Sequence, residues 1–460
     1  MEIARRFNGE IINADAMQLY QGLPVITNKI TEDEMKGVPH HLLGCIGLEE
    51  ETWTVGKFVA NALRVVSHSK NSSQKVAETV EIDEIRSRGK LPVLVGGTHY
   101  YTQALLFKDA LADTPVIKNG DEQHKVFPIL EGPTEVILQK LREVDPVMAE
   151  RWHPNERRKI RRSLEIYLQT GKPASQIYDE QRINRDLSSG DGDGVGGLRF
   201  PTVMFWVHAS KDILYARLDS RVDKMLENGL LSEVQTLHDF RTSLEERTRQ
   251  PVDQSRGIWV SIGYKEFLDY EMSLSNLSIN DKERERLMTQ AVEKTQAATR
   301  QYAKRQVKWI QIKLLNALLT AGQGGTLFLA DSSDMSKWDT EVLKPSIKTV
   351  GQFLSGQKLP DPRAMSDAAR EMLTPRRNYD LSQRPDLWQQ KICETCGTIA
   401  VTENEWNLHI KSRAHRRAVG VRKKHEAQKE VRHEKSRTRQ EDGTDVLGSY
   451  MPTFPDESDK

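Results

Sequence analysis

The sequence predicts an α/β protein whose core is a parallel sheet, extended by a helical insertion and by a small metal-binding module. Three observations support this prediction. Short apolar runs at 11–12, 91–95 and 202–207 end at polar turns and alternate with helical patterns, as is typical of parallel α/β folds. Residues 113–199 contain helical patterns and no clear strand. Near the C-terminus, two cysteines and two histidines have the spacing of a metal site.

Length and composition limit the classes of protein that this chain can represent. Its 460 residues favour two to four domains with a sizeable core. The 67 Lys and Arg residues balance 66 Asp and Glu, so only the local distribution of charge is informative about partners. Three cysteines cannot form a disulfide framework, and no apolar run approaches the ~20 residues that a membrane span needs. We expect an intracellular protein with no membrane partner, located in the cytoplasm, the mitochondrion or the nucleus.

A carboxylate closely follows the first strand. Ile11 and Ile12 end an apolar run, and Asp15 comes three residues later. Ligands bind beyond the carboxyl ends of strands in open α/β sheets, so Asp15 is placed where a general base or a metal ligand would lie. The alternative is that Asp15 caps the next helix, with Gln18 completing a capping box.

A glycine pair follows the second apolar run. Leu91–Val95 is succeeded by Gly96-Gly97-Thr98 and then by a helical pattern from His99. Glycines let backbone amides approach a phosphate, and a helix N-terminus adds partial positive charge. An ordinary tight turn between strand and helix needs glycines just as much, so both interpretations stay open.

Several predicted helices carry basic side chains on one face. After His153-Pro154-Asn155, four arginines share a face with only Glu165 nearby to neutralise them, which favours phosphate binding: Arg157, Arg158, Arg161 and Arg162. A long helix over about 211–240 places Arg217 and Arg221 one turn apart. Another, over about 281–321, interleaves cations with aromatic rings as an RNA-binding helix would: Arg300, Tyr302, Lys304, Arg305, Lys308 and Trp309.

The glycine-rich segment 192–197 formally satisfies G-x-G-x-x-G. It follows polar residues and precedes a strand, whereas a dinucleotide-binding loop must follow a strand and open a helix. We expect a surface insertion there and no dinucleotide site.

The C-terminal region contains the metal-binding pattern. Residues 351–388 are expected to form a linker, 389–420 a zinc finger, and 421–460 a charged, disordered tail. Cysteine and histidine at C-x2-C-x12-H-x5-H satisfy a tetrahedral Zn²⁺, with the ligands Cys393, Cys396, His409 and His415. Residues 411–440 hold 12 Lys or Arg against 3 Glu, which favours contact with nucleic acid over an import signal or a solvated helix.

Taken in order, these segments resemble the tRNA dimethylallyltransferase (tRNA isopentenyltransferase) family, in its eukaryotic, fungal-like branch. Residues 15–20 resemble the family's D-S-x-Q-x-Y segment, with Ala16 replacing serine, and 95–101 resemble its G-G-T-x-x-Y loop. Similar segments follow in the family's order at 153–165, 217–230, 262–266 and 299–306. The eukaryotic branch also carries a C-terminal zinc finger.

The resemblance implies a P-loop-like α/β core and transfer of a dimethylallyl group. The group would pass from dimethylallyl diphosphate to N6 of the adenine beside the anticodon of tRNA. Asp15 would take the proton from the amine, and Thr98 would orient the diphosphate or the leaving oxygen. Arg217 and Arg221, with Mg²⁺, would hold the diphosphate. The core would comprise residues 1–112 and 200–350, and the helical insertion would comprise 113–199.

The resemblance also implies that the target base is flipped out of the RNA into the site. Gln18 would help to read this base, and the anticodon stem-loop would contact side chains spread over the chain. The residues expected to contact tRNA are Ala16, Met17, Gln18, Arg158, Arg161, Arg162, Lys265, Arg300, Lys304, Arg305 and Trp309.

One departure from the family pattern concerns the phosphate loop. Family members begin with a strand and a G-x-x-x-x-G-K-[ST] loop, and this pattern occurs nowhere in residues 1–460. The expectation from the sequence is that it is incomplete at its N-terminus. The alternative is a tRNA-binding protein that has lost catalysis.

Overall fold

The computed structural model describes five stretches of the chain: 1–63, 82–107, 127–180, 197–375 and 387–445. They form two compact units. The first unit contains Met1–Asn119 and Asp179–Asp380, and the second contains Gly120–Tyr178 and Leu381–Lys460. The glycines at 192–196, within the expected surface insertion, lie outside the described residues.

The first unit contains two parallel sheets, which confirms the predicted α/β class. One has the order β2-β1-β3, where β2 is His40–His41, β1 is Gly9–Asn13 and β3 is Leu91–Val95. In the other, β4 (Met204–His208) pairs with β5 (Leu327–Asp331). Every pairing within these sheets is parallel, so each connection must cross over through other structure. The apolar runs predicted as strands are β1, β3 and β4.

Helices and turns of the first unit cover these sheets. Between β1 and β3 lie α3 (Val55–Leu63) and α4 (Ile82–Ser87), and α5 (His99–Leu106) follows β3. The main core gathers apolar side chains from β1, α3 and α5 with others from α11 (Leu230–Thr248) and α12 (Tyr264–Ser275), including the fully buried Phe58 and Tyr264, and Tyr20 joins them from the turn after β1. Because β1 is buried along its whole length, the turn that follows it is anchored in this core.

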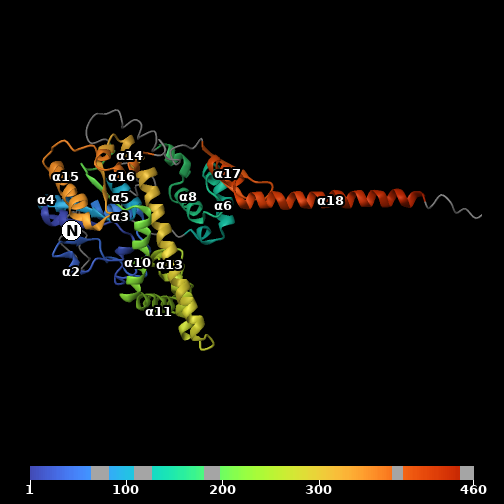
Figure 1. Ribbon diagram of the computed structural model, residues 1–460, viewed down its shortest axis with the longest axis horizontal. Coiled ribbons are helices and arrows are strands. Elements are labelled where there is room, and N and C mark those ends of the chain that lie inside the picture. Colours follow the sequence, from blue (N-terminus) through green and yellow to red (C-terminus); the bar gives the residue numbers. More distant parts are fainter. Residues whose placement is uncertain (64–81, 108–126, 181–196, 376–386, 446–460) are drawn as a thin grey trace, which may run out of the picture. The chain divides into compact units, whose positions relative to one another are not determined.

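Two long helical segments lie side by side in the first unit (Figure 1). The predicted helix over 211–240 is two helices, α10 (Lys211–Glu227) and α11 (Leu230–Thr248). Gly229 between them has a φ of 97°, a conformation that favours glycine and breaks the helix there. Next come α12 (Tyr264–Ser275) and α13 (Asp281–Trp309), which continues through the π-helical η5 (Ile310–Leu314) into α14 (Leu315–Thr320), as predicted.

The expected linker over 351–388 is wrong in part. The helix α15 extends over Lys344–Leu354, and a later helix, α16 (Asp367–Met372), packs against β5. Ala369 is fully buried and Leu373 is 4% exposed, in a cluster with Leu327 and Leu329 of β5. Periodicity alone did not reveal α16 because the helix is only six residues long.

The second unit combines the helical insertion with the C-terminal module. The insertion consists of α6 (Thr134–Val144), α7 (Pro146–Arg151) and α8 (Arg157–Thr170), which share a core of their own. The module consists of the hairpin β6 (Trp388–Ile392) and β7 (Ile399–Thr402), followed by α17 (Glu403–Ile410) and the first turn of α18 (Arg413–Asp445). The insertion ends before residue 199, because Leu198 packs in the core of the first unit.

The basic C-terminal segment is a helix through most of its length. The helix α18 extends over Arg413–Asp445, so the expected disordered tail is wrong up to Asp445 (Figure 1). The sequence of α18 has few apolar residues and is rich in strong helix formers such as Lys, Arg, Glu and Gln. These residues stabilise a helix that is surrounded by solvent. No helix of the described residues combines the length and the apolar character that crossing a bilayer demands.

Candidate active site and zinc site

The turn after β1 is held in one conformation by hydrogen bonds around Asp15. The side-chain amide of Asn13 donates to the carbonyl oxygens of Leu42 (2.8 Å) and Asp15 (3.1 Å), and its Oδ1 accepts from the amide of Asp15 (3.0 Å). Oδ1 of Asp15 accepts a hydrogen bond from the amide of Met17 at 2.9 Å. Asp15 therefore binds the amide of the first residue of the short 3-10 turn η1 (Met17–Leu19), although the N-cap residue of this turn is Ala16 and not, as the alternative interpretation had it, Asp15.

The predicted capping box with Gln18 does not form. The amide of the Gln18 side chain instead donates to the carbonyl oxygen of Asn28 at 2.8 Å. Oδ2 of Asp15 lies 3.5 Å from the position that a Cβ on Gly97 would occupy. One carboxylate oxygen thus orders the turn, while the other faces the glycine turn after β3.

Thr98 links the turns that follow the two neighbouring strands. Its Oγ1 accepts a hydrogen bond of 2.9 Å from the amide of Ala16, and its own amide donates to the carbonyl oxygen of Ala14 at 3.1 Å. A Cβ on Gly96 would lie 2.2 Å from the carbonyl carbon of Ala14, so the close approach of the two turns requires glycine. Gly96 therefore serves tight packing, as in the ordinary-turn interpretation.

Burial and neighbouring cations set the electrostatics of Asp15. Burial raises the pKa of Asp15 above its ordinary value, although hydrogen bonds from the backbone at Met17 and Gln18 and the charges of Arg221 and Lys29 oppose that shift. Burial also lowers the pKa of Arg221, and it lowers the pKa of Lys29 to about 8. A partly buried carboxylate with a raised pKa beside cations is typical of a catalytic site.

The predicted diphosphate residues line an open depression on α10. Arg217 and Arg221 lie one turn apart there, together with Lys224 and Ser333. Arg217 donates a hydrogen bond of 3.0 Å to the carbonyl oxygen of Ser333. The Nε of Arg221 is buried and has no hydrogen-bond partner among the described residues. The sequence prediction missed Lys224, although its position three residues after Arg221 is the signal that would have identified it.

The helix α13 contributes two further side chains that the sequence prediction left out of the site. Gln306 donates a hydrogen bond of 3.0 Å to the carbonyl oxygen of Gly97. Burial and the nearby charge of Asp15 raise the pKa of Tyr302. Tyr302 and Gln306 are four residues apart, so the same face of α13 approaches both Asp15 and the glycine turn.

The other residues of the first unit predicted to contact tRNA differ in their surroundings. Lys265, Lys304 and Arg305 are exposed. Arg300 instead forms an ion pair with Asp219 of α10, which ties α13 to α10. Trp309 stacks on His99 with ring centroids 5.0 Å apart, so one face of its ring is covered.

The arginines of α8 lie in the second unit, and most have partners within it. Arg157 donates to the carbonyl oxygen of Gly132 at 2.7 Å. Arg162 pairs with Glu165 and Arg161 pairs with Glu131, each at 2.9 Å. The prediction that Glu165 is the only nearby acid was therefore wrong, because Glu131 arrives from a segment 30 residues away. Arg158 is exposed.

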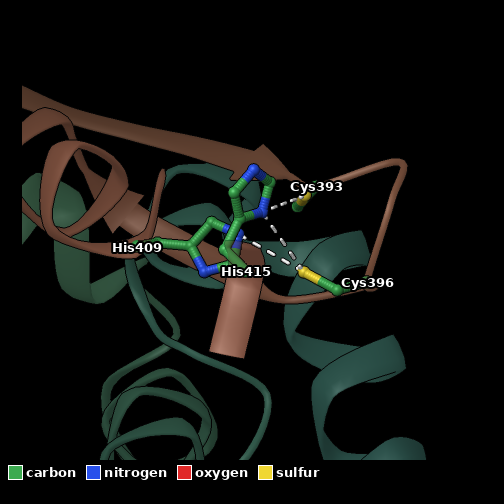
Figure 2. Close-up of side chains that lie close together, drawn as sticks. All are labelled: Cys393, Cys396, His409 and His415. Carbon is green, nitrogen blue, oxygen red and sulfur yellow. Dashed lines mark hydrogen bonds between the residues drawn. The ribbon is translucent and has the colours of Figure 1, made fainter. Parts of the chain in front are cut away.

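The four predicted metal ligands converge at the C-terminal module (Figure 2). Their ligand atoms all lie within 4.8 Å of one another. The Sγ of Cys393 is 3.5 Å from Nδ1 of His415, and the Sγ of Cys396 is 3.3 Å from Nε2 of His409. Zn–S and Zn–N bonds of about 2.3 and 2.0 Å at a tetrahedral angle place S and N about 3.5 Å apart, so the four atoms fit a Zn²⁺ ion.

The electrostatics of the Cys396 thiol also suit a metal. Hydrogen bonds with Thr398 and His415 lower the pKa of Cys396 to about 6, which favours the thiolate that Zn²⁺ binds. Four protein ligands leave no open coordination position, so such a zinc would be structural. Within the described part of the chain, no other group of three or more His, Cys, Asp or Glu side chains is arranged to hold a metal.

Known proteins with a similar sequence and fold identify the family of this chain. Residues 18–313 match the IPP transferase family. The chain is 36% identical over 450 residues to the tRNA dimethylallyltransferase of Schizosaccharomyces pombe, covering 94% of each chain. It is 31% identical to the human tRNA dimethylallyltransferase, covering 90% of this chain and 81% of the human one. A solved structure of a eukaryotic dimethylallyltransferase acting on tRNA superimposes with a TM-score of 0.69 at 30% identity, over 94% of this chain and 95% of that one. The chain belongs to the IPP transferase family.

Proposed function

We propose that this protein transfers a dimethylallyl group from dimethylallyl diphosphate to N6 of the adenine adjacent to the anticodon in tRNA. The observation that carries the proposal is the likeness over nearly the whole chain to proteins named tRNA dimethylallyltransferase. The site supports it, because a partly buried carboxylate and a hydroxyl lie at the ends of two parallel strands, and cations lie near the carboxylate. The names of these relatives favour a transferase over an RNA-binding protein without activity.

Asp15 is the general base of the proposed reaction. The exocyclic amine of adenine is a poor nucleophile because its lone pair is delocalised into the ring, and removal of a proton during attack relieves this. A positioned base contributes about 10²–10⁴ in rate. Oδ1 of Asp15 is engaged by the amide of Met17, so Oδ2 is the oxygen that would accept the proton. The raised pKa of Asp15 strengthens it as a base at neutral pH.

Cations on α10 neutralise the departing diphosphate. Breaking the bond between the allylic carbon and oxygen leaves negative charge on the diphosphate oxygens, so positive groups that bind these oxygens stabilise the transition state. Arg217, Arg221 and Lys224 present such groups on one face of α10. The hydroxyl of Thr98 accepts from the amide of Ala16 and keeps its proton to donate to an oxygen of the diphosphate.

Mg²⁺ and Zn²⁺ have different sites in this proposal. Mg²⁺ commonly binds through one or two carboxylates together with substrate phosphates. Asp15 is the carboxylate beside the turns of β1 and β3, so the diphosphate would supply most of the ligands to a Mg²⁺ ion, whose charge would aid departure of the leaving group. Zn²⁺ would be held by Cys393, Cys396, His409 and His415 and would stabilise the fold of the module.

The tRNA ligand is held through exposed basic side chains. Lys304 and Arg305 of α13, Lys265 of α12 and Arg158 of α8 are exposed and able to reach phosphates. Gln18 and the backbone at Ala16 and Met17 lie beside Asp15, where an extruded base would enter. Arg161, Arg162 and Arg300 would have to exchange a carboxylate partner for RNA, which makes their contribution smaller.

The test is transfer of label from dimethylallyl diphosphate to an unmodified tRNA transcript. Digestion to nucleosides and mass spectrometry should identify one dimethylallyl adenosine per tRNA, and a transcript with guanosine at the target position should stay unlabelled. Binding of tRNA without transfer at any diphosphate and Mg²⁺ concentration would contradict the proposal.

A further inference from the structure

An arginine of the helical insertion packs against the first residue of the zinc module. Arg151 is the last residue of α7 in the insertion, and Trp388 is the first residue of β6 in the module. The guanidinium of Arg151 lies 4.9 Å from the ring centroid of Trp388 and 5.0 Å from that of Trp152. The two rings are themselves in edge contact, with centroids 6.0 Å apart. We call Arg151, Trp152 and Trp388 the aromatic clamp.

The insertion side of the clamp is fixed. The indole Nε1 of Trp152 donates a hydrogen bond of 2.9 Å to the hydroxyl of Ser163 on α8, and Ser163 is only 2% exposed. Met148 and Ala149 of α7 are buried in the core of the insertion. The Nζ of Lys159 lies 5.1 Å from the ring centroid of Trp152, so a second cation from α8 also holds this ring.

On the module side, Trp388 of the clamp belongs to the strand that immediately precedes the first metal ligand. The strand β6 extends from Trp388 to Ile392, and Cys393 is the next residue. Trp388 is paired in register with Thr402 of β7, and Thr402 caps α17, the helix that carries His409. Zinc binding orders Cys393 and His409, so it also orders the strand that presents Trp388 to Arg151.

We propose that Arg151 is a positioning residue that fixes the zinc module on the helical insertion, so that the two bind RNA as one body. An arginine between two indole rings forms a cation–π interaction with each, and this geometry is specific to a planar, permanently charged group. Without it, the module would remain folded around its metal but would lose its fixed orientation on α7. Only the choice of tRNA as the ligand rests on the function proposed above.

Hydrogen exchange tests the link without requiring RNA or activity. Removing zinc with a chelator should speed amide exchange in α7 as well as in the module of the parent protein. In Arg151→Met, which keeps the length of the side chain and removes its charge, exchange in α7 should be fast with or without zinc. The variant should bind one zinc per chain, as the parent does. If removing zinc left the rate of amide exchange in α7 of the parent protein unchanged, the proposal would be overturned.

The consequence for RNA binding is a loss of affinity with little loss of turnover. Arg151→Met should raise the KM for tRNA about fivefold and leave kcat and the KM for dimethylallyl diphosphate unchanged, because the clamp touches no reacting group. Arg151→Lys should recover part of the loss. Arg142→Met, at an exposed arginine of α6, is the matched control and should resemble the parent. Equal tRNA affinity of Arg151→Met and Arg142→Met would also overturn the proposal. Absence of dimethylallyl transfer in the parent would contradict the proposed function but not the role of Arg151.

Discussion

The amide of Ala16 donates a hydrogen bond of 2.9 Å to Oγ1 of Thr98, across 82 residues of sequence. This bond joins the turn that carries Asp15 to the turn that opens α5. The base and the hydroxyl of the proposed reaction are therefore held at a fixed separation by adjacent parallel strands. A small displacement of either turn would change the geometry of transfer more than the stability of the fold.

Removing the Thr98 hydroxyl tests this arrangement. Thr98→Val leaves the amide of Ala16 without its partner and removes the donor to the diphosphate, so transfer should fall about 10- to 100-fold in single-turnover measurements. Thr98→Ser keeps the hydroxyl and should stay within a few-fold of the parent. Equal rates for the valine and serine variants would show that the hydroxyl plays no part.

Adding a methyl group at Gly96 tests the close approach of the two turns. A Cβ there would lie 2.2 Å from the carbonyl carbon and 2.3 Å from the carbonyl oxygen of Ala14, so the backbone must move. Gly96→Ala should destabilise the protein by about 1–3 kcal/mol and reduce transfer strongly. Gly325→Ala is the control, because nothing lies within 4 Å of its added Cβ. Matching unfolding midpoints for the two variants would contradict the packing described here.

Glu10 of β1 makes the stability of the core depend on pH. Its side chain is 1% exposed and contacts Lys90 at 2.7 Å, Arg88 at 2.8 Å and His41 at 2.7 Å. Burial alone would raise the pKa of Glu10, but the hydrogen bonds from Lys90, Arg88 and His41 outweigh it and lower the pKa from 4.5 to about 2. A lowered folded-state pKa means that the stabilisation is complete above pH 4.5 and is lost as the pH falls toward 2.

Glu10→Gln should therefore lose about 1–3 kcal/mol of stability at pH 7 and progressively less as the pH falls below 4.5. Urea unfolding of the parent and the variant at pH 7, 4.5 and 3 measures this difference, and loss of zinc in acid affects both proteins alike. Glu2→Gln, at an exposed ion pair with Arg5, should change stability little at any pH. If the difference in unfolding free energy between Glu10→Gln and the parent did not vary with pH, Glu10 would not have a lowered pKa in the folded protein.

The exposed basic face of α13 should govern how tRNA binding depends on salt. Reversing the charges of Lys304 and Arg305 together should weaken binding and reduce the slope of log affinity against log salt by about 1 to 2. The control reverses Lys348 and Lys358, two exposed lysines of the same unit, with the same change in net charge. If both double variants had the same slope, the effect would come from net charge and not from contact at α13.

The sequence was sufficient to predict the parallel α/β class, the position of Asp15 just beyond its strand and the convergence of two cysteines and two histidines, because each depends on residues close together in the chain. Asp15 follows its strand by two residues, and the zinc ligands have a recognisable spacing. Partners from distant segments were not predictable in this way. Glu131 neutralises Arg161, Asp219 pairs with Arg300, and Gln306 binds the carbonyl oxygen of Gly97, and each contact is created only by tertiary packing.

One local feature and one tertiary feature explain the errors in helix boundaries. The break between α10 and α11 depends on the positive φ of a single glycine, Gly229, within an otherwise continuous apolar pattern. The helix α16 is too short to show a period, and it is stable because Ala369 and Leu373 are buried against β5. Burial against β5 therefore decides that residues 367–372 form a helix, which the periodicity of the sequence could not show.

The single-turnover rate of dimethylallyl transfer in Asp15→Asn shows whether Asp15 is the general base. Asparagine keeps the oxygen that accepts from the amide of Met17 but cannot take a proton. At saturating tRNA and dimethylallyl diphosphate, the rate should fall at least ~100-fold while the affinity for tRNA stays near that of the parent. In the parent, the rate should decline as the pH falls through the raised pKa of Asp15. A rate for Asp15→Asn close to that of the parent would show that Asp15 is not the base.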